Sequence, residues 1–346
     1  MDAEGTFYKG PIYSNIRILV TGTRGKSSLV RLLHAGLSAT GLRVWSRVTG
    51  VLPRSFSPNG VRIIRRDAPV SFQEMRWWLE QIPWDADAVV MENSAVSPEL
   101  QSVAGRWLNP TLIVWTTLRP DHEDAWGPGR SNAALALLHG IPEGVPIVAG
   151  QEVVSLQAEL EAKKCPVIFS PASPSRSFRE ENLQLAMTAL RCVMEKYPEP
   201  DLIKAQNAME TLEPDIADFR IIGKGNDLLA AAFSANDVES TTMLFNETGW
   251  RPKETMLLYH HRPDRPVRLR GFLPWIASMP WRGTVFTRTA RPFFPFSFIQ
   301  ASRLKWEDSI RDPGSFAAWR RGRGKIFACG NVAGWPLAYL LTNGGA

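Results

Sequence analysis

Short apolar runs alternate with stretches of helical periodicity through the first part of the chain. Apolar positions spaced three and four apart follow most runs, which is the pattern of a helix covering one face of a sheet. This alternation predicts a parallel sheet with helices on both faces. The predicted strands are residues 16–20, 43–48, 88–91, 111–117, 145–149 and 167–169. The predicted helices follow residue 28 and cover about 75–81, 131–139, 152–163 and 181–197.

A segment rich in acidic residues and proline, 199–218, interrupts the alternation and is interpreted as an excursion between two domains. A second alternation follows, with strands at 228–233, 256–260, 284–287 and 325–329 and helices at 238–247, 266–278 and up to about 341. We therefore expect a larger, mostly parallel sheet domain over residues 1–216. A smaller Rossmann-like α/β domain is expected over residues 217–346.

Composition agrees with two ordinary globular domains. The 346 residues are 44% hydrophobic and 21% charged, and the net charge is +6. A basic balance attracts anionic partners, but the basic residues are not gathered on one helix with interleaved aromatics. The densest run, 320–325, is interpreted as a short solvated turn. Nucleic-acid binding is therefore not expected.

The cysteines indicate a reducing compartment. Cys165, Cys192 and Cys329 lie far apart and have no metal-ligand spacing, so we expect buried free thiols of a cytoplasmic protein. We see no N-terminal signal and no apolar run long enough to span a bilayer. The protein is expected to be soluble, or peripheral at the inner membrane face through partners.

A phosphate loop follows the first predicted strand, with the sequence TGTRGKSS over residues 21–28. A strand, a glycine-rich loop and a helix start together form an anion site, because backbone N–H groups and the helix dipole point at the phosphate. Lys26 is expected to reach the terminal phosphates, and Ser27 to hold Mg²⁺. Val20 replaces the first glycine of a strict Walker A loop. The alternative is a glycine-rich turn with a solvated lysine.

Acidic and imidazole groups follow two further strands of the first domain. Glu92 comes directly after strand 88–91, where a Mg²⁺ ligand is needed beside a phosphate loop. The alternative for Glu92 is a helix cap or a surface acid. His122 lies between Asp121 and Asp124 after the next strand, and a neutral imidazole there can bind a second metal. The alternative for His122 is an ordinary loop residue.

Three segments of the second domain fall at strand ends. Arg262 and Arg265 flank a Pro-Asp pair, and guanidinium groups can clamp phosphoryl oxygens; the alternative is an interdomain salt bridge of Asp264. Asn236 and the turn 330–334 start helices, so capping is a strong alternative there. The aromatic segment 293–298 is either buried core or, if exposed, a surface for a partner or membrane.

Taken together, these motifs resemble the Mur ligase superfamily, and within it the ligase subunit of poly-γ-glutamate synthase (PgsB/CapB type). The resemblance spans about residues 16–341. It is carried, in order, by residues 21–27, 91–99, 121–124, 233–237, 262–265 and 330–334. It implies a Mur-type central ATP-binding domain with a phosphate loop, followed by the Rossmann-like domain. It also implies an ATP-dependent amide ligase, in which ATP phosphorylates a carboxylate and an amine attacks the acyl phosphate.

The resemblance assigns roles to individual positions. Lys26, Ser28 and the loop residues Gly22, Thr23, Arg24 and Gly25 would bind the phosphates of ATP. Ser27 and Glu92 would bind one Mg²⁺, and His122 a second metal. Asn182 would contact adenine, and Asn236 belongs to the predicted nucleotide-binding set. Arg262 and Arg265 would complete the site when the domains close, which excludes water from the acyl phosphate.

The chain also departs from the family pattern. The phosphate loop begins at residue 22, which leaves no room for a UDP-sugar domain, so a nucleotide-sugar substrate is not expected. The membrane helix of many relatives is not found, so any membrane tie is expected through partner subunits. Ala231 and Ala232 stand where a ribose-binding Asp is usual, and residues 117–122 differ from the usual Asn-Val-x-x-Asp-His pattern. No carbamylated lysine can be assigned, and residues 280–305 do not match.

The leading hypothesis is an ATP- and Mg²⁺-dependent amide ligase that acts on glutamate or a glutamyl chain. Two rivals remain open. One is a phosphate-loop kinase, which would phosphorylate a stable acceptor instead of making an amide. The other is a nucleotide-binding regulatory or assembly subunit of a membrane synthase complex with little turnover of its own. The residues leave open which amino acid is ligated, and whether the chain forms a homo-oligomer.

Overall fold

The computed structural model describes residues 14–66, 71–172, 177–198, 200–235, 237–263, 265–289 and 304–343. The chain divides into two compact units, Met1–Leu212 and Glu213–Ala346. This division falls four residues before the boundary after residue 216 that the sequence predicts. Within the described residues, no helix is long and apolar enough to cross a membrane.

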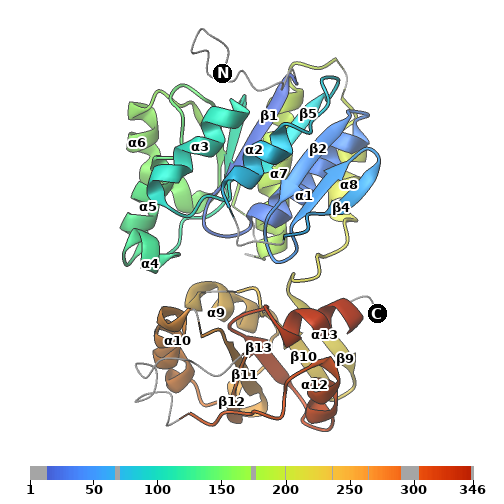
Figure 1. Ribbon diagram of the computed structural model, residues 1–346, viewed down its shortest axis with the longest axis vertical. Helices are drawn as coiled ribbons and strands as arrows, with labels where there is room; N and C mark the ends of the chain where they lie inside the picture. Colours follow the sequence, from blue (N-terminus) through green and yellow to red (C-terminus); the bar gives the residue numbers. More distant parts are fainter. Residues whose placement is uncertain are drawn as a thin grey trace. The chain divides into compact units, whose positions relative to one another are not determined.

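The first unit is built on an eight-stranded sheet in the order β4-β3-β2-β5-β1-β6-β7-β8. Figure 1 shows its strands β1, β5 and β2 side by side. Its strands are β1 Ile16–Thr21, β2 Val44–Val48, β3 Arg54–Ser57, β4 Gly60–Ile63, β5 Ala88–Glu92, β6 Leu112–Trp115, β7 Ile147–Ala149 and β8 Val167–Phe169. The strands from β2 to β8 pair in parallel, whereas β3 and β4 add an antiparallel hairpin at one edge. The mostly parallel sheet that we predicted is thus confirmed, but the sequence analysis missed this hairpin.

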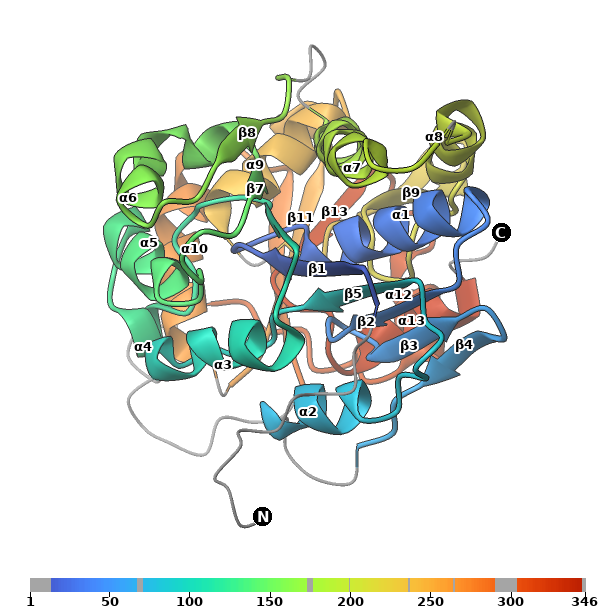
Figure 2. The same ribbon diagram turned by 90° about the horizontal axis from the view of Figure 1, so that it is seen from above.

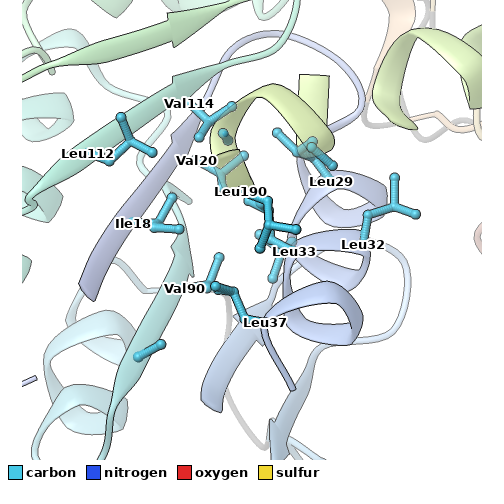
Figure 3. Close-up of a cluster of buried hydrophobic side chains, with 14 of the residues drawn as sticks. Ile18, Val20, Leu29, Leu32, Leu33, Leu37, Val90, Leu112, Val114 and Leu190 are labelled. Carbon is cyan, nitrogen blue, oxygen red and sulfur yellow. The ribbon is translucent and has the colours of Figure 1, made fainter. Parts of the chain in front are cut away.

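Helices cover both faces of this sheet. They are α1 Lys26–Ala39, α2 Gln73–Leu79, α3 Pro98–Leu108, α4 Glu123–Trp126, α5 Arg130–Leu138, α6 Gln157–Ala162, α7 Phe178–Met194 and α8 Leu202–Glu210, with a 3₁₀ turn at Gln151–Leu156. Figure 2 shows α1, α7 and α8 on one side of the central strands, with α2 and α3 on the other. Apolar side chains of α1 and α7 pack on Ile18, Val20 and Val90 of the sheet (Figure 3).

One prediction in this unit is wrong, and one helix was missed. Segment 199–218 is not only an excursion, because α8 belongs to the first unit and its Met209 is fully buried in the core. A Cβ built on Gly36 of α1 would lie 2.0 Å from Cε of Met209, which shows how closely the two helices pack. Residues 98–108, which we did not predict as regular structure, form the amphipathic helix α3.

The second unit contains a five-stranded sheet in the order β12-β11-β13-β10-β9. Its strands are β9 Arg220–Lys224, β10 Asp227–Ala231, β11 Met256–His261, β12 Gly283–Arg288 and β13 Ile326–Cys329. Its helices are α9 Val238–Glu247, α10 Pro266–Ser278, α12 Pro313–Arg320 and α13 Trp335–Asn343, with a 3₁₀ turn at Pro252–Glu254. Only β9 pairs antiparallel among the described strands of this sheet. The Rossmann-like α/β class is confirmed, whereas β9 and α12 were not predicted.

Two details of composition are corrected by packing. Cys165 and Cys329 are buried as predicted, but Cys192 is only partly buried. The basic run 320–325 is not wholly a solvated turn. The guanidinium of Arg320 donates to the carbonyl oxygens of Ile222 and Asp227, and thereby holds the hairpin formed by β9 and β10.

Candidate active site

The phosphate loop turns sharply at the carboxyl end of β1. Val20 is level with Glu92 of β5, and Thr21 with Trp115 of β6, so three strand ends meet at one edge. Gly22 has φ +121°, and a Cβ there would lie 2.2 Å from Oγ1 of Thr116. Only glycine fits this close approach, because the conformation and the space both exclude a side chain. Helix α1 then begins at Lys26, with its first N–H groups at the loop.

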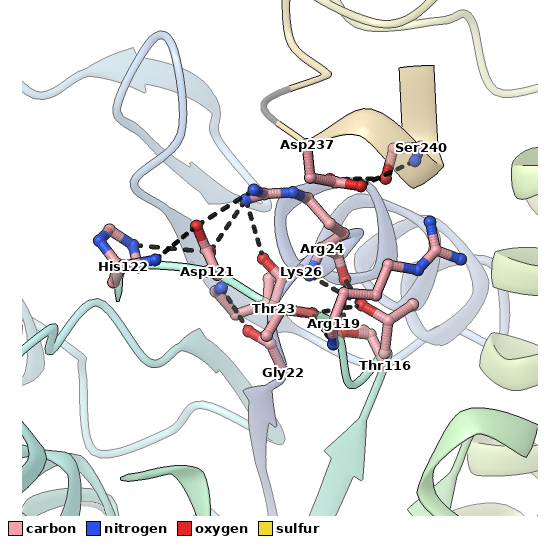
Figure 4. A network of polar contacts seen from close by, with 11 residues as sticks. Gly22, Thr23, Arg24, Lys26, Thr116, Arg119, Asp121, His122, Asp237 and Ser240 are labelled. Carbon is pink, nitrogen blue, oxygen red and sulfur yellow. Dashed lines mark hydrogen bonds and ion pairs between the residues drawn. The ribbon is translucent and has the colours of Figure 1, made fainter. Parts of the chain in front are cut away.

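Backbone and hydroxyl contacts with the β6 loop hold the phosphate loop in place (Figure 4). The Thr23 amide donates to the Thr117 carbonyl at 3.1 Å, and the Arg24 amide donates to the Thr117 hydroxyl at 2.9 Å. The Arg119 amide donates to the Thr23 hydroxyl at 3.0 Å. The Thr116 hydroxyl donates to the Thr21 carbonyl at 3.1 Å. A loop fixed in this way can present its amides to an anion with little reorganisation.

Lys26 folds back over the loop. Its Nζ donates to the carbonyl oxygen of Gly22 at 2.6 Å. Burial lowers the pKa of Lys26, whereas the negative charges of Glu92 and Asp121 act in the opposite direction. The ammonium thus lies at the helix start with the Gly22 carbonyl as its partner, and a phosphate can exchange for that carbonyl.

Ser27 and Glu92 meet at the start of α1. The Ser27 hydroxyl donates to Oε2 of Glu92 at 2.8 Å, and the Thr49 amide donates to the same oxygen at 2.9 Å. Glu92 is buried, with 5% of its surface exposed. Gly50 keeps space beside Ser27, because a Cβ there would lie 2.8 Å from the hydroxyl. The structure thus brings together two predicted metal ligands that are 65 residues apart in the sequence.

These two oxygens suit Mg²⁺. Mg²⁺ is octahedral with ligands at about 2.0–2.1 Å, so two adjacent ligands lie roughly 3 Å apart. The separation of 2.8 Å between Ser27 Oγ and Glu92 Oε2 is close to that value. Within the described residues, no group of three or more His, Cys, Asp or Glu side chains could hold a metal. That finding is compatible with Mg²⁺, which keeps waters and phosphate oxygens among its ligands.

Arg24 and Asp121 form a partly buried, bidentate ion pair. Nη1 and Nη2 of Arg24 donate to the two carboxylate oxygens at 2.9 and 3.1 Å. Burial raises the pKa of Asp121, but the charges of Arg24, His122 and Lys26 outweigh it and hold that pKa below its usual value. Asp121 therefore stays ionised and links the phosphate loop to the loop after β6.

His122 adopts a left-handed conformation, with φ +46°, at the start of α4. Its amide donates to Oδ1 of Asp121 at 3.0 Å, and its Nε2 lies 3.6 Å from Oδ2. Its ring contacts Trp126, with the centroids 5.2 Å apart. Asp121 thus holds the backbone of His122, and its carboxylate lies near the ring.

The loop has a second flank, formed by α7 and the loop after β6. Asn182 of α7 lies against Gly25, since a Cβ on Gly25 would be 2.8 Å from the Asn182 Oδ1. The Arg119 side chain is buried, its Nε donates to Glu152 at 2.8 Å, and its guanidinium lies 5.0 Å from the Phe178 ring centre. The sequence analysis missed the pairing of Arg119 with Glu152, because nothing local relates the two residues.

The predicted residues of the second unit lie at strand ends. Arg262 follows β11, and the Arg265 amide donates to the Arg262 carbonyl at 3.0 Å at the start of α10. Asn331 supports its own turn, because its side chain accepts from the Ala333 amide at 2.8 Å. Asn236, Asp264 and the aromatic segment 293–298 lie outside the described residues.

The chain is similar to several known proteins. Residues 216–341 match the family model of the poly-gamma-glutamate synthase CapB C-terminal domain. The chain is 24% identical over 297 residues to the capsule biosynthesis protein CapB of Bacillus anthracis, covering 76% of this chain and 61% of that protein. It is also 24% identical over 297 residues to the PGA synthase CapB of Bacillus subtilis (strain 168), covering 76% of this chain and 72% of that protein. The chain therefore spans about three fifths of the B. anthracis relative.

Among solved structures, the chain is similar to E. coli FolC in complex with ADP, without folate substrate. The TM-score is 0.65 at 16% identity, over 95% of this chain and 89% of that one. At this identity the likeness concerns the fold. The CapB matches confirm the resemblance to CapB-type poly-γ-glutamate synthases, and the likeness to FolC confirms the predicted fold.

Proposed function

We propose that the protein is an ATP- and Mg²⁺-dependent amide ligase that activates the carboxylate of a glutamyl substrate and couples it to an amine. The observation that carries the proposal is the Ser27–Glu92 contact beside the phosphate loop, which pairs a metal-binding hydroxyl and carboxylate at the start of α1. The CapB relatives and the FolC fold support the reaction class.

In the first step, different residues of the chain bind the phosphates and the metal. The amides of residues 22–28 and the Lys26 ammonium bind the β- and γ-phosphates. Ser27 and Glu92 would hold Mg²⁺, which neutralises charge on the phosphate oxygens. A substrate carboxylate oxygen attacks the γ-phosphorus, ADP leaves, and the amine then displaces phosphate from the acyl phosphate. Asn182, which lies beside Gly25, is proposed to contact adenine.

The remaining site predictions keep the status of proposals. His122 would hold a second metal, and the Asp121 carboxylate lies near its ring. Arg262 and Arg265 belong to the second unit, and their guanidinium groups would stabilise charge on the transferring phosphoryl group. Association with membrane partner subunits also stays a proposal, and it rests on the family resemblance of the sequence alone.

The test measures ADP, phosphate and amide product from ATP–Mg²⁺ with D-glutamate, L-glutamate and γ-glutamyl-glutamate. The wild-type chain should release phosphate only with a matching substrate and yield an amide by mass spectrometry. Lys26→Ala should reduce turnover by at least about a hundredfold, as expected for loss of a charged phosphate contact. Lys196→Ala, which removes an exposed lysine of the same unit, is the matched control. A stable phosphorylated product without an amide would identify a kinase instead.

A further inference from the structure

A second cluster of charged groups lies on the first unit, at the strand next to Glu92. Arg47 of β2 is level with Met91 of β5, the residue before Glu92, and Thr49 donates to Glu92 two residues later. Arg47 has no exposed surface, although it is charged. A buried guanidinium so close to the candidate phosphate site requires partners for its donors.

The partners of Arg47 within the described structure are incomplete. Its Nη2 contacts Oε1 of Glu74 on α2. Glu74 is also bound by Arg66, whose Nε and Nη2 donate to the two carboxylate oxygens at 2.6 and 2.9 Å. Among the described residues, Nε and Nη1 of Arg47 have no hydrogen-bond partner. Two guanidinium groups thus share one carboxylate. The two remaining donors of Arg47 could bind a further acceptor.

Glu74 also connects the cluster to a surface hollow. This hollow has a volume of about 300 Å³ and is lined by Ile64, Arg65, Ser71, Gln73, Glu74 and Trp77. Arg65 is exposed at its rim. Positive charge at Arg65 attracts an anionic chain to this hollow, and Glu74 is the residue that links its lining to Arg47 and Arg66.

We propose that Arg47, supported by Arg66 and Glu74, binds a second carboxylate of the acyl donor, whose reacting carboxylate lies at the phosphate loop. The inference rests on the proposed ligase function and names the part of the chain that recognises its acidic substrate. A carboxylate is the ligand that fits, because it accepts two parallel N–H bonds from one guanidinium. Its charge also balances the net positive charge of the cluster.

The acyl donor, rather than the amine, is the substrate that must contact the γ-phosphate. Arg47 stands on the strand that pairs with β5, and β5 ends in Glu92 at the predicted metal. A glutamyl group carries a second carboxylate a short aliphatic chain away from the reacting one. Arg47 therefore acts in positioning and specificity, since it touches the end of the substrate that does not react.

The experiment compares Arg47→Met and Arg47→Lys with the wild-type full chain. Arg43→Met, which removes an exposed arginine directly before β2, is the control. Binding of glutarate is measured by calorimetry without ATP. KM values for γ-glutamyl-glutamate and for ATP are measured separately, and acyl phosphate is trapped as a hydroxamate by hydroxylamine, which displaces phosphate from the activated carbonyl.

Arg47→Met should weaken glutarate binding and raise the KM for the glutamyl substrate by about ten- to a hundredfold, the range of a lost hydrogen bond to a charged group. The KM for ATP should stay within about twofold, and Arg47→Lys should restore part of the loss. Hydroxamate formation at low donor concentration should fall in parallel. Resistance to urea should not decrease, because Met removes a guanidinium that shares its carboxylate with Arg66.

Three results would overturn the inference. The first is unchanged glutarate binding in Arg47→Met. The second is normal hydroxamate formation with impaired amide formation, which would assign Arg47 to the amine. The third is a joint rise of both KM values with lower stability, which would indicate a structural role. If the wild type makes no amide but binds glutarate through Arg47, the carboxylate site stands and the ligase proposal falls. If an amide forms with an unchanged KM in Arg47→Met, the ligase proposal stands and the carboxylate site falls.

Discussion

A histidine in the second unit makes the stability of that unit dependent on pH. His260 of β11 is buried, its Nδ1 lies 2.8 Å from the Thr287 hydroxyl, and its Nε2 lies 3.1 Å from the Ala333 carbonyl. Because a carbonyl only accepts, Nε2 carries the proton and Nδ1 accepts from Thr287. Burial lowers the pKa of His260 to about 4 from an ordinary value of 6.5, and the neighbouring His261 acts in the same direction.

The sign and size of the effect follow from linkage. The unfolded chain binds a proton near pH 6.5, whereas the folded chain binds it only near pH 4, so stability is lost as pH falls through that window. The whole difference is worth about 3 kcal/mol, and about 2 kcal/mol of it is lost between pH 7.5 and pH 5. His260→Gln can donate to Ala333 and accept from Thr287 but cannot take up the proton.

The assay is hydrogen exchange of peptides from β11 and β13, corrected for the intrinsic rate at each pH. In the wild type, the opening free energy of these strands should fall between pH 7.5 and pH 5 by about 2 kcal/mol more than in His260→Gln. The contributions of the other titrating groups cancel, because they are the same in the wild type and in the variant. Exposed His139→Gln should show the wild-type pH dependence. Equal pH dependence in the wild type and His260→Gln would refute the reasoning.

Three further outcomes are expected. Gly22→Ala should abolish ATP binding, because its Cβ would lie 2.2 Å from the Thr116 hydroxyl in a conformation with φ +121°; nucleotide titration measures the loss. Met209→Ala should destabilise the first unit by about 2–5 kcal/mol, since this fully buried side chain joins α8 to the core; urea unfolding measures it. Glu92→Gln should raise the Mg²⁺ concentration needed for half-maximal turnover by at least about tenfold, because a charged ligand is lost; turnover against Mg²⁺ concentration measures it.

Each of these outcomes has a control or a contradicting result. Gly41→Ala places a Cβ at another left-handed glycine with no atom within 4 Å, so it separates backbone strain from the clash. Retained nucleotide binding in Gly22→Ala would show that the loop relaxes. A decrease of less than about 1 kcal/mol in the free energy of unfolding of Met209→Ala would show that α8 acts as a linker and not as part of the core. A Glu92→Gln variant with wild-type Mg²⁺ dependence would remove Glu92 from the metal site.

Local pattern alone determined much of the fold. The helices 238–247 and 266–278 were predicted with the observed bounds, the second despite Pro274 within it. The phosphate loop was recognised because its glycines, lysine and serine are consecutive, and the strand and helix on either side have their own periodicity. Both features depend on neighbours in the chain, which a sequence displays directly.

Only the tertiary structure decided which distant groups meet. The Ser27–Glu92 contact joins residues 65 apart, and the Arg24–Asp121 pair joins residues 97 apart, because β5 and β6 lie on either side of β1. Segment 199–218 is rich in acidic residues and proline, yet α8 within it buries one face on α1. Whether that face can pack depends on the shape of the surface of α1, which the local sequence does not show. The local sequence does not reveal that Arg47 is buried or that it shares a carboxylate with another arginine. Both facts depend on α2, which places Glu74 against Arg47.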